Sequence, residues 1–136
     1  MKKAKLFAAI MLGGLATAAT AQSSVTLYGI IDLSLSRESN SSGIATRMES
    51  GVLNGSRFGL KGAEDRGGGL AARFQIEGGI NADDGSSAQG GRLFGRTAWV
   101  GLEGGFGQVR LGRQYTPIYL SLLTVDPFGG AFKGDM

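Results

Sequence analysis

Apolar and polar residues alternate along several segments of the chain that follow residue 24. In residues 25–36 most odd positions are apolar and most even positions are polar. The clearest case is residues 70–80, where polar Arg73, Gln75 and Glu77 occupy odd positions between apolar or small neighbours. A period of two places successive side chains on opposite faces of a β-strand. The pattern therefore predicts strands with one polar face and one apolar face.

The connections between the predicted strands alternate in length. We expect strands at residues 25–36, 51–62, 70–80, 92–103 and 108–115. We expect long, polar, exposed loops at 37–50 and 81–91, and short glycine-rich turns at 63–69 and 104–107. The strands of a soluble β-sandwich also alternate between apolar and polar residues, but the connections between them do not alternate strictly between long and short. Long loops at one end and short turns at the other are typical of up-and-down barrels. We therefore predict an all-β, antiparallel, up-and-down transmembrane β-barrel.

The N-terminal segment, residues 1–21, has the three parts of a secretory signal peptide. Three lysines come first, residues 6–19 are uncharged and mostly apolar, and residues 19–21 read Ala-Thr-Ala, a small-x-small cleavage site. The apolar run is shorter than the roughly 20 residues that a membrane-spanning helix needs. We expect cleavage before Gln22, export of the chain, and a mature region at residues 22–136.

The charge balance changes once the signal peptide is set apart. Those first residues hold three of the 14 basic residues and no acidic one, so the mature region carries 11 basic and 11 acidic residues. This balance, without a basic run that contains aromatics, gives no indication of nucleic-acid binding. The chain has no cysteine and no histidine. Disulfides, the commonest metal ligand and the usual general base are thus missing, and we expect neither a cofactor nor an enzyme.

Four motifs together resemble the trimeric general porins of Gram-negative bacteria. They are VTLYG at residues 25–29, SRFGLKG at 56–62, RTAWVGL at 96–102 and LGRQY at 111–115. Each is weak alone, but four in this order are specific. The resemblance implies an outer-membrane homotrimer whose subunits are barrels of about sixteen strands, through which small hydrophilic solutes and ions diffuse. Because about five strands cannot close a barrel, we expect this chain to be the N-terminal part of one.

The resemblance also implies a constriction loop that folds into the barrel and faces a basic cluster. We place the start of this loop at residues 116–136, with Asp126 as its acidic candidate and Asp135 as a weaker one. From strand parity we assign four basic residues to the lumen: Arg57, Lys61, Arg73 and Arg96. Opposed charges across a narrow gap order water and tune ion preference. The alternative is that these are ordinary solvated charges on a strand face.

Arg113 shares the parity of Val109 and Leu111, which places it on the outer face. An arginine that faces the bilayer midplane costs about 2–4 kcal/mol, so it must lie near a lipid headgroup or contact another subunit. The resemblance implies contact with another subunit, and we predict that Arg113 lies at the subunit interface.

Two other function classes stay open besides a diffusion pore. The first is an outer-membrane barrel enzyme, whose nucleophile and base would have to lie outside this sequence. The second is a secreted β-rich adhesin, which would dissolve without detergent.

Overall fold

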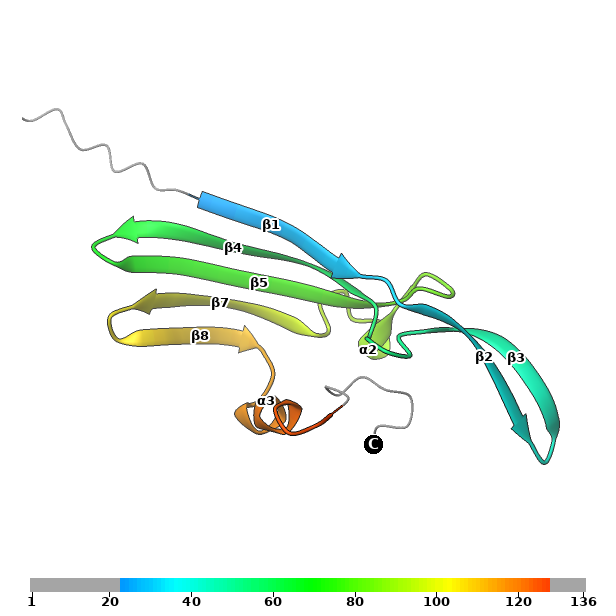
Figure 1. Cartoon of the computed structure of the whole chain (residues 1–136). Coiled ribbons are helices and arrows are strands. Elements are labelled where there is room, and N and C mark those ends of the chain that lie inside the picture. Colours follow the sequence, from blue (N-terminus) through cyan, green and yellow to red (C-terminus); the bar gives the residue numbers. More distant parts are fainter. Residues whose placement is uncertain (1–22, 128–136) are drawn as a thin grey trace, which may run out of the picture.

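The computed structural model describes residues 23–127 (Figure 1). The elements in chain order are β1 (Ser23–Ile30), β2 (Leu33–Asn40), β3 (Gly43–Ser50), β4 (Arg57–Gly67), β5 (Leu70–Asn81), β6 (Ser86–Ser87), α2 (Ala88–Gly91), β7 (Thr97–Gly104), β8 (Gly107–Arg113) and α3 (Pro117–Leu123). Figure 1 shows one curved sheet, a hairpin that projects from one end of it, and a short helix beside its last strand. Among the described residues, no helix is long and apolar enough to cross a membrane.

The main sheet follows the order of the chain. Its strands lie in the order β1-β4-β5-β7-β8, every neighbouring pair is antiparallel, and β6 pairs with the end of β5. An antiparallel meander of this kind is what the alternating pattern predicted, so the all-β, up-and-down fold class is confirmed for this part of the chain. The predicted strand at residues 70–80 matches β5 closely, because its alternation is the most regular in the sequence.

The two short connections are tight hairpin turns. Between β4 and β5, Gly68 and Gly69 both have positive φ angles, 63° and 77°. Such a two-residue turn needs left-handed backbone at both positions, which glycine adopts without strain. The turn predicted at residues 63–69 was too long, since β4 continues to Gly67 and Asp65 pairs with Ala71. Charged residues at the strand end are exposed, and their polarity alone does not end a strand.

The segment after β1 differs from the prediction. The expected loop at residues 37–50 is wrong, because β2 and β3 pair antiparallel over their full length. The expected strand at 25–36 is divided between β1 and β2. The β2–β3 turn is stabilised by Asn40, whose side-chain oxygen accepts a hydrogen bond of 2.9 Å from the Ser42 backbone N–H. Polar residues gave the appearance of a loop, although the segment was correctly expected to be exposed.

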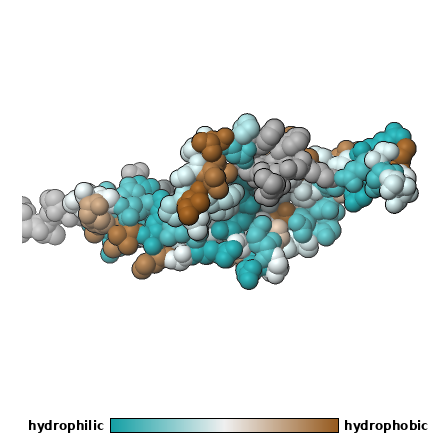
Figure 2. Space-filling view, turned by 90° about the horizontal axis from the view of Figure 1, so that it is seen from below, coloured by the Kyte–Doolittle hydropathy of each residue, from teal (hydrophilic) through white to brown (hydrophobic). Residues whose placement is uncertain are grey.

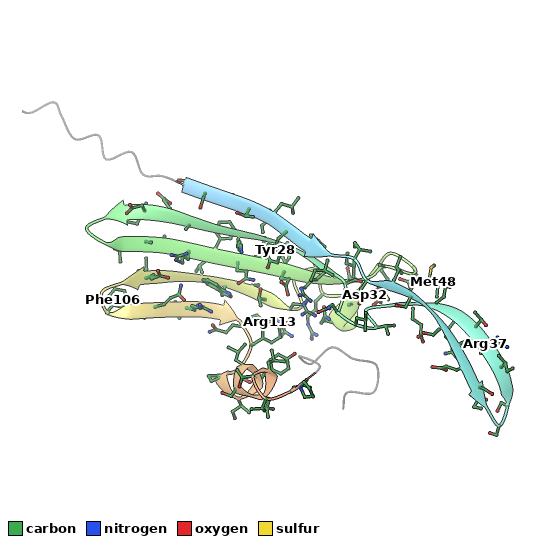
Figure 3. The ribbon with its side chains drawn as sticks, in the orientation of Figure 1. Tyr28, Asp32, Arg37, Met48, Phe106 and Arg113 are labelled. Carbon is green, nitrogen blue, oxygen red and sulfur yellow. The ribbon has the colours of Figure 1, made fainter. Side chains whose placement is uncertain are left out.

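Asp32 fixes the junction between the main sheet and the β2–β3 hairpin, as Figure 3 shows. Its carboxylate accepts hydrogen bonds from the backbone N–H groups of Leu53 and Asn54, at 2.9 and 2.6 Å. Its backbone N–H donates to the hydroxyl of buried Ser56 at 3.0 Å. Residues 51–56 therefore form a structured loop, and the predicted second strand starts later, at Arg57.

The predicted loop at residues 81–91 and the next strand also differ in detail. The loop contains the two residues of β6 and the four residues of α2. The strand expected at 92–103 begins only at Thr97, as β7. Strand boundaries depend on pairing with β5, which sequence periodicity does not specify.

One face of the main sheet is apolar and uncovered. Its large exposed side chains include Val25, Leu27, Phe58, Val100, Leu102, Val109 and Leu111. A soluble sheet packs its apolar face on a core. Here the one large apolar side chain that is buried among the described residues is Trp99, which lies on the opposite face. An exposed apolar face opposite a polar face is the arrangement expected of a barrel wall whose apolar side contacts lipid.

Candidate functional site

Residues directly opposite each other on antiparallel strands lie on the same face of a sheet. The strand register therefore defines the polar face of the main sheet. Its side chains include Thr26, Tyr28, Arg57, Lys61, Asp65, Arg73, Gln75, Glu77, Thr97, Trp99, Glu103, Gln108 and Arg110. Three predicted site residues, Arg57, Lys61 and Arg73, lie on this face as strand parity indicated.

Glu77 on β5 is the centre of a polar cluster on this face. It is only 6% exposed. Its carboxylate lies 2.6 Å from Arg96 Nε and 3.9 Å from Arg57 Nε. A buried carboxylate is stable only when it is paired and hydrogen-bonded. The three side chains, which we call the Glu77 cluster, carry a combined charge of about +1 at neutral pH.

Tyr28 completes the hydrogen bonding of this carboxylate. Its hydroxyl donates to Glu77 Oε2 at 2.9 Å and accepts from Gln75 Nε2 at 2.7 Å. The ring reaches β5 from β1 by crossing over Gly59 on β4. A Cβ at Gly59 would lie 2.7 Å from the tyrosine ring and 2.7 Å from the Ile76 carbonyl oxygen. Glycine at this position therefore makes room for Tyr28.

Arg96 joins the cluster for a reason other than strand parity. Its parity is that of Ala98 and Val100, which pair on the apolar face. Arg96 precedes β7, its backbone N–H donates to the Glu77 carbonyl at 3.1 Å, and its side chain turns to the Glu77 carboxylate. Arg57 and Arg96 were both predicted to face the lumen, and both contact Glu77. The parity argument for Arg96 was nevertheless wrong, because the residue lies before the strand begins.

A second charged group lies nearer the short turns. Arg73 binds Glu103 through two contacts, of 2.8 and 2.9 Å, and both side chains are about two-fifths exposed. Gln108 donates to the same carboxylate at 3.1 Å, and its side-chain oxygen accepts from Arg110 Nε at 2.6 Å. Exposed ion pairs of this kind contribute little to stability. Their importance here is that the Arg73 charge is compensated on the wall itself.

The segment after β8 folds back against the polar face. Pro117 begins α3, and the Thr116 hydroxyl caps the helix by accepting from the Tyr119 N–H at 3.3 Å. Tyr115 stacks on Tyr119 at 4.9 Å, and the Arg96 guanidinium lies 6.0 Å from the Tyr115 ring centre. Burial raises the pKa of the Tyr115 hydroxyl above its ordinary value.

An open cavity of 770 Å³ lies between α3 and the strands. Its lining includes Gln75, Glu77, Trp99 and Arg110 from the polar face, and Pro117 and Leu120 from α3. Figure 2 shows a hydrophobic patch where α3 lies, beside a mostly hydrophilic surface. The predicted loop segment at residues 116–136 therefore begins as a helix placed over the polar face.

Two acidic candidates were assigned to this loop. Asp126 lies just after α3, where its backbone N–H donates to the Leu122 carbonyl at 3.0 Å. Asp135 lies outside the described residues, as does the predicted signal peptide. The carboxylate that the structure places against Arg57 and Arg96 is Glu77, on the wall itself.

Glu77 and Trp99 were not among the predicted site residues. Parity had placed Glu77 on the polar face, so the signal for it was present but unused. Trp99 has the same odd parity as Glu103. The guanidinium carbon of Arg110 lies 4.5 Å from the centre of the Trp99 ring. An aromatic residue at a polar-face position, flanked by apolar residues of the other parity, is the pattern that indicates such a platform.

Arg113 lies on the apolar face, opposite Ala98, as predicted. It is exposed, and its Nε donates to the carbonyl oxygen of Gly95 in the same chain. Figure 3 places it at the end of β8, on the side of the sheet nearest α3. Its guanidinium is therefore held at the loop end of the wall, away from the middle of the apolar face.

Known proteins resemble the chain in both sequence and fold. The sequence model described as Gram-negative porin matches residues 8–135. An outer membrane porin of Bordetella pertussis is 44% identical over 97% of this chain and 38% of its own length. Outer membrane porin protein 32 of Delftia acidovorans is 41% identical over 98% of this chain and 39% of its own. The chain thus spans less than two-fifths of these relatives.

A solved structure agrees with this similarity. The anion-selective porin from Comamonas acidovorans superimposes with a TM-score of 0.71 at 40% identity, over 81% of this chain and 33% of that one. The family match extends over residues 8–135, and the fold agrees with it. The chain belongs to the Gram-negative porin family.

Proposed function

We propose that the chain forms part of the wall of an outer-membrane pore through which small hydrophilic solutes and ions diffuse passively. The observation that carries this proposal is the polarity of the sheet. Large apolar side chains are exposed on one face, while the ionised groups of the Glu77 cluster gather on the other. Lipid against the first face and water against the second satisfy both surfaces.

The wall belongs to a larger barrel in this proposal. Within residues 23–127, β1 pairs on one side with β4 and β8 pairs on one side with β7, which leaves an outer edge on each. Unpaired backbone groups are not stable in lipid, so a membrane sheet must close on itself. The relatives are more than twice as long as this chain, which fits with further strands. We call the closed assembly that contains these residues the complete barrel.

Electrostatics of the wall favour anions. The cations of the polar face and the Glu77 cluster are Arg57, Lys61, Arg73, Arg96 and Arg110, against the carboxylates Asp65, Glu77 and Glu103. An excess of positive charge on a confined wall raises the local concentration of anions. The similar protein from Comamonas acidovorans is described as anion-selective, which agrees in sign.

Asp126, just after α3, is the proposed acid of the constriction loop.

A homotrimer in the outer membrane is the proposed assembly. Arg113 is exposed on the lipid-facing side, where a guanidinium needs a polar partner beyond a single carbonyl. Contact with a neighbouring subunit supplies one. The described residues do not support the barrel enzyme, because the usual general base and thiol nucleophile are absent from the sequence. They do not support the secreted adhesin either, because the apolar face of the main sheet is uncovered.

The proposal is tested by replacing both Arg57 and Arg96 with alanine in the complete barrel. This change leaves Glu77 without its cations, so the local charge changes from about +1 to about −1. Two effects are expected together in planar lipid bilayers. Conductance rises because side-chain volume is lost, and the reversal potential in a salt gradient shifts toward cation preference.

A matched control is Arg37→Ala, which removes one exposed cation from the β2–β3 hairpin, outside the main sheet (Figure 3). It is expected to leave the reversal potential unchanged. If the double variant assembles normally and keeps the conductance and reversal potential of the unaltered protein, the Glu77 cluster does not line the pore.

A further inference from the structure

The cations of the polar face differ in what neutralises them. Arg57 and Arg96 share Glu77, and Arg73 is paired with Glu103. Among residues 23–127, no carboxylate lies within ion-pair distance of Lys61 or Arg110. These two therefore carry uncompensated charge on the wall.

Arg110 is also held in one orientation. Its Nε donates to Gln108 Oε1 at 2.6 Å, and Gln108 is itself bound to Glu103. Its guanidinium lies over the Trp99 ring, with the carbon 4.5 Å from the ring centre. Both contacts fix the guanidinium plane while the terminal Nη groups make no hydrogen bond within the described part of the chain. The two Nη groups lie side by side and can donate a pair of parallel hydrogen bonds to one carboxylate.

The surroundings of Arg110 contain both polar and apolar groups. The cavity that it lines is also bordered by the side-chain amides of Gln75 and Gln114, and by Leu120 and Pro117 from α3. The Glu77 carboxylate borders it too, but it is paired with Arg57 and Arg96. An anion without an apolar part would use only the arginine and the amides. A ligand with a flat hydrocarbon body also has the helix wall to contact.

We propose that Arg110, supported by Trp99, forms a binding subsite for small organic carboxylates that carry a flat apolar group. The carboxylate binds the two Nη groups of Arg110, and the apolar body lies against the α3 side of the cavity. This inference rests on the proposed pore function and adds a substrate class to it. Occupancy is transient, because the cavity is open and the solute must leave to cross the pore.

Lys61 provides the matched control. It has the same charge and lies on the same face, with its ammonium 5.5 Å from the Tyr28 ring centre. Lys61 does not line the cavity under α3. An ammonium is also a point charge, without the planar pair of donors that a guanidinium offers. Loss of Lys61 therefore alters the general potential of the wall but leaves the subsite intact.

The test measures how potassium benzoate and potassium acetate reduce the chloride current through the complete barrel in planar bilayers. Benzoate is expected to block at a lower concentration than acetate. In Arg110→Gln the half-blocking benzoate concentration is expected to rise by about tenfold or more, because a charged bidentate contact is lost. Lys61→Gln is expected to change it by less than about twofold, since only distant screened charge is removed.

A second variant separates geometry from charge. Arg110→Lys keeps the cation but loses the paired donors, so benzoate is expected to block it nearly as weakly as Arg110→Gln. Equal block by benzoate and acetate, or equal weakening in the Lys61 and Arg110 variants, would overturn the subsite. A chloride current with no benzoate block overturns the subsite alone, whereas absence of any current from the unaltered complete barrel overturns the pore.

Discussion

Replacement of Glu77 by glutamine is the perturbation that most directly tests the electrostatics of the wall. Arg96 Nε lies 2.6 Å from Glu77 Oε1 in the unaltered protein. Glutamine has nearly the same shape as glutamate, so its carbonyl oxygen can still accept this hydrogen bond, while the negative charge is lost. The Glu77 cluster then changes from about +1 to about +2. We expect a stronger preference for anions, opposite in sign to the effect of removing Arg57 and Arg96.

The magnitude follows from Coulomb's law. One additional charge about 8 Å from the ion path changes the energy of a monovalent ion by about 0.5 kcal/mol in water. The change is favourable for an anion and unfavourable for a cation, so the permeability ratio changes by about fivefold. At about 0.15 M salt, where the Debye length is about 8 Å, screening reduces this to about twofold. The effect should therefore grow as the salt concentration falls.

The assay is the reversal potential of the complete barrel in planar bilayers at two salt concentrations. Glu103→Gln is the matched control, because it removes one carboxylate from the same face but from an ion pair that is about two-fifths exposed. Water already screens that pair well, so its effect should be the smaller one.

Assembly must be measured beside the reversal potential, since breaking a buried ion pair can cost about 3–5 kcal/mol. Heat-dependent migration of the trimer in detergent gels serves this purpose. An assembled Glu77→Gln barrel with an unchanged reversal potential at low salt would refute the reasoning. Equal shifts in the two variants would show that position on the wall is unimportant, which also contradicts it.

Two further predictions concern the faces of the sheet. Single cysteines placed in the complete barrel at Gln75 and Ile76 should differ in their reaction with a water-soluble thiol reagent. Adjacent residues of β5 lie on opposite faces of the sheet. If one face meets water and the other lipid, as proposed, Gln75→Cys should be labelled and Ile76→Cys should not; equal labelling would reject a two-faced strand. Arg113→Ala should lower the melting temperature of the trimer in detergent gels, and an unchanged trimer would favour contact with a headgroup instead.

The sequence by itself determined the strand type and the faces of the main sheet. Side-chain direction along a strand depends only on the local period of two, so Arg57, Lys61 and Arg73 could be assigned to the polar face without coordinates. The alternation of long and short connections specified the up-and-down order for a similar reason, because strands joined by tight turns must be antiparallel neighbours. Arg113 on the apolar face follows from the same rule.

Local periodicity failed where the chain leaves the main sheet. Residues 37–50 are polar enough to resemble a loop, yet they pair as part of β2 and β3. Arg96 lies just before β7, so its side-chain direction is set by the loop and not by strand parity. In both cases the deciding contacts join residues far apart in sequence or lie outside regular strands.

Only the tertiary structure decided which charges compensate one another. Glu77 contacts Arg57 and Arg96 because the register of β4 with β5 and the path of the loop before β7 bring them together. The same register lays Arg110 on Trp99 and leaves it without a carboxylate among the described residues. Parity assigns each side chain to a face, but distance across strands depends on register and loop path. The face of a charge within a strand is thus a property of the sequence, whereas the pairing of the charges, and the position of Arg96, are properties of the fold.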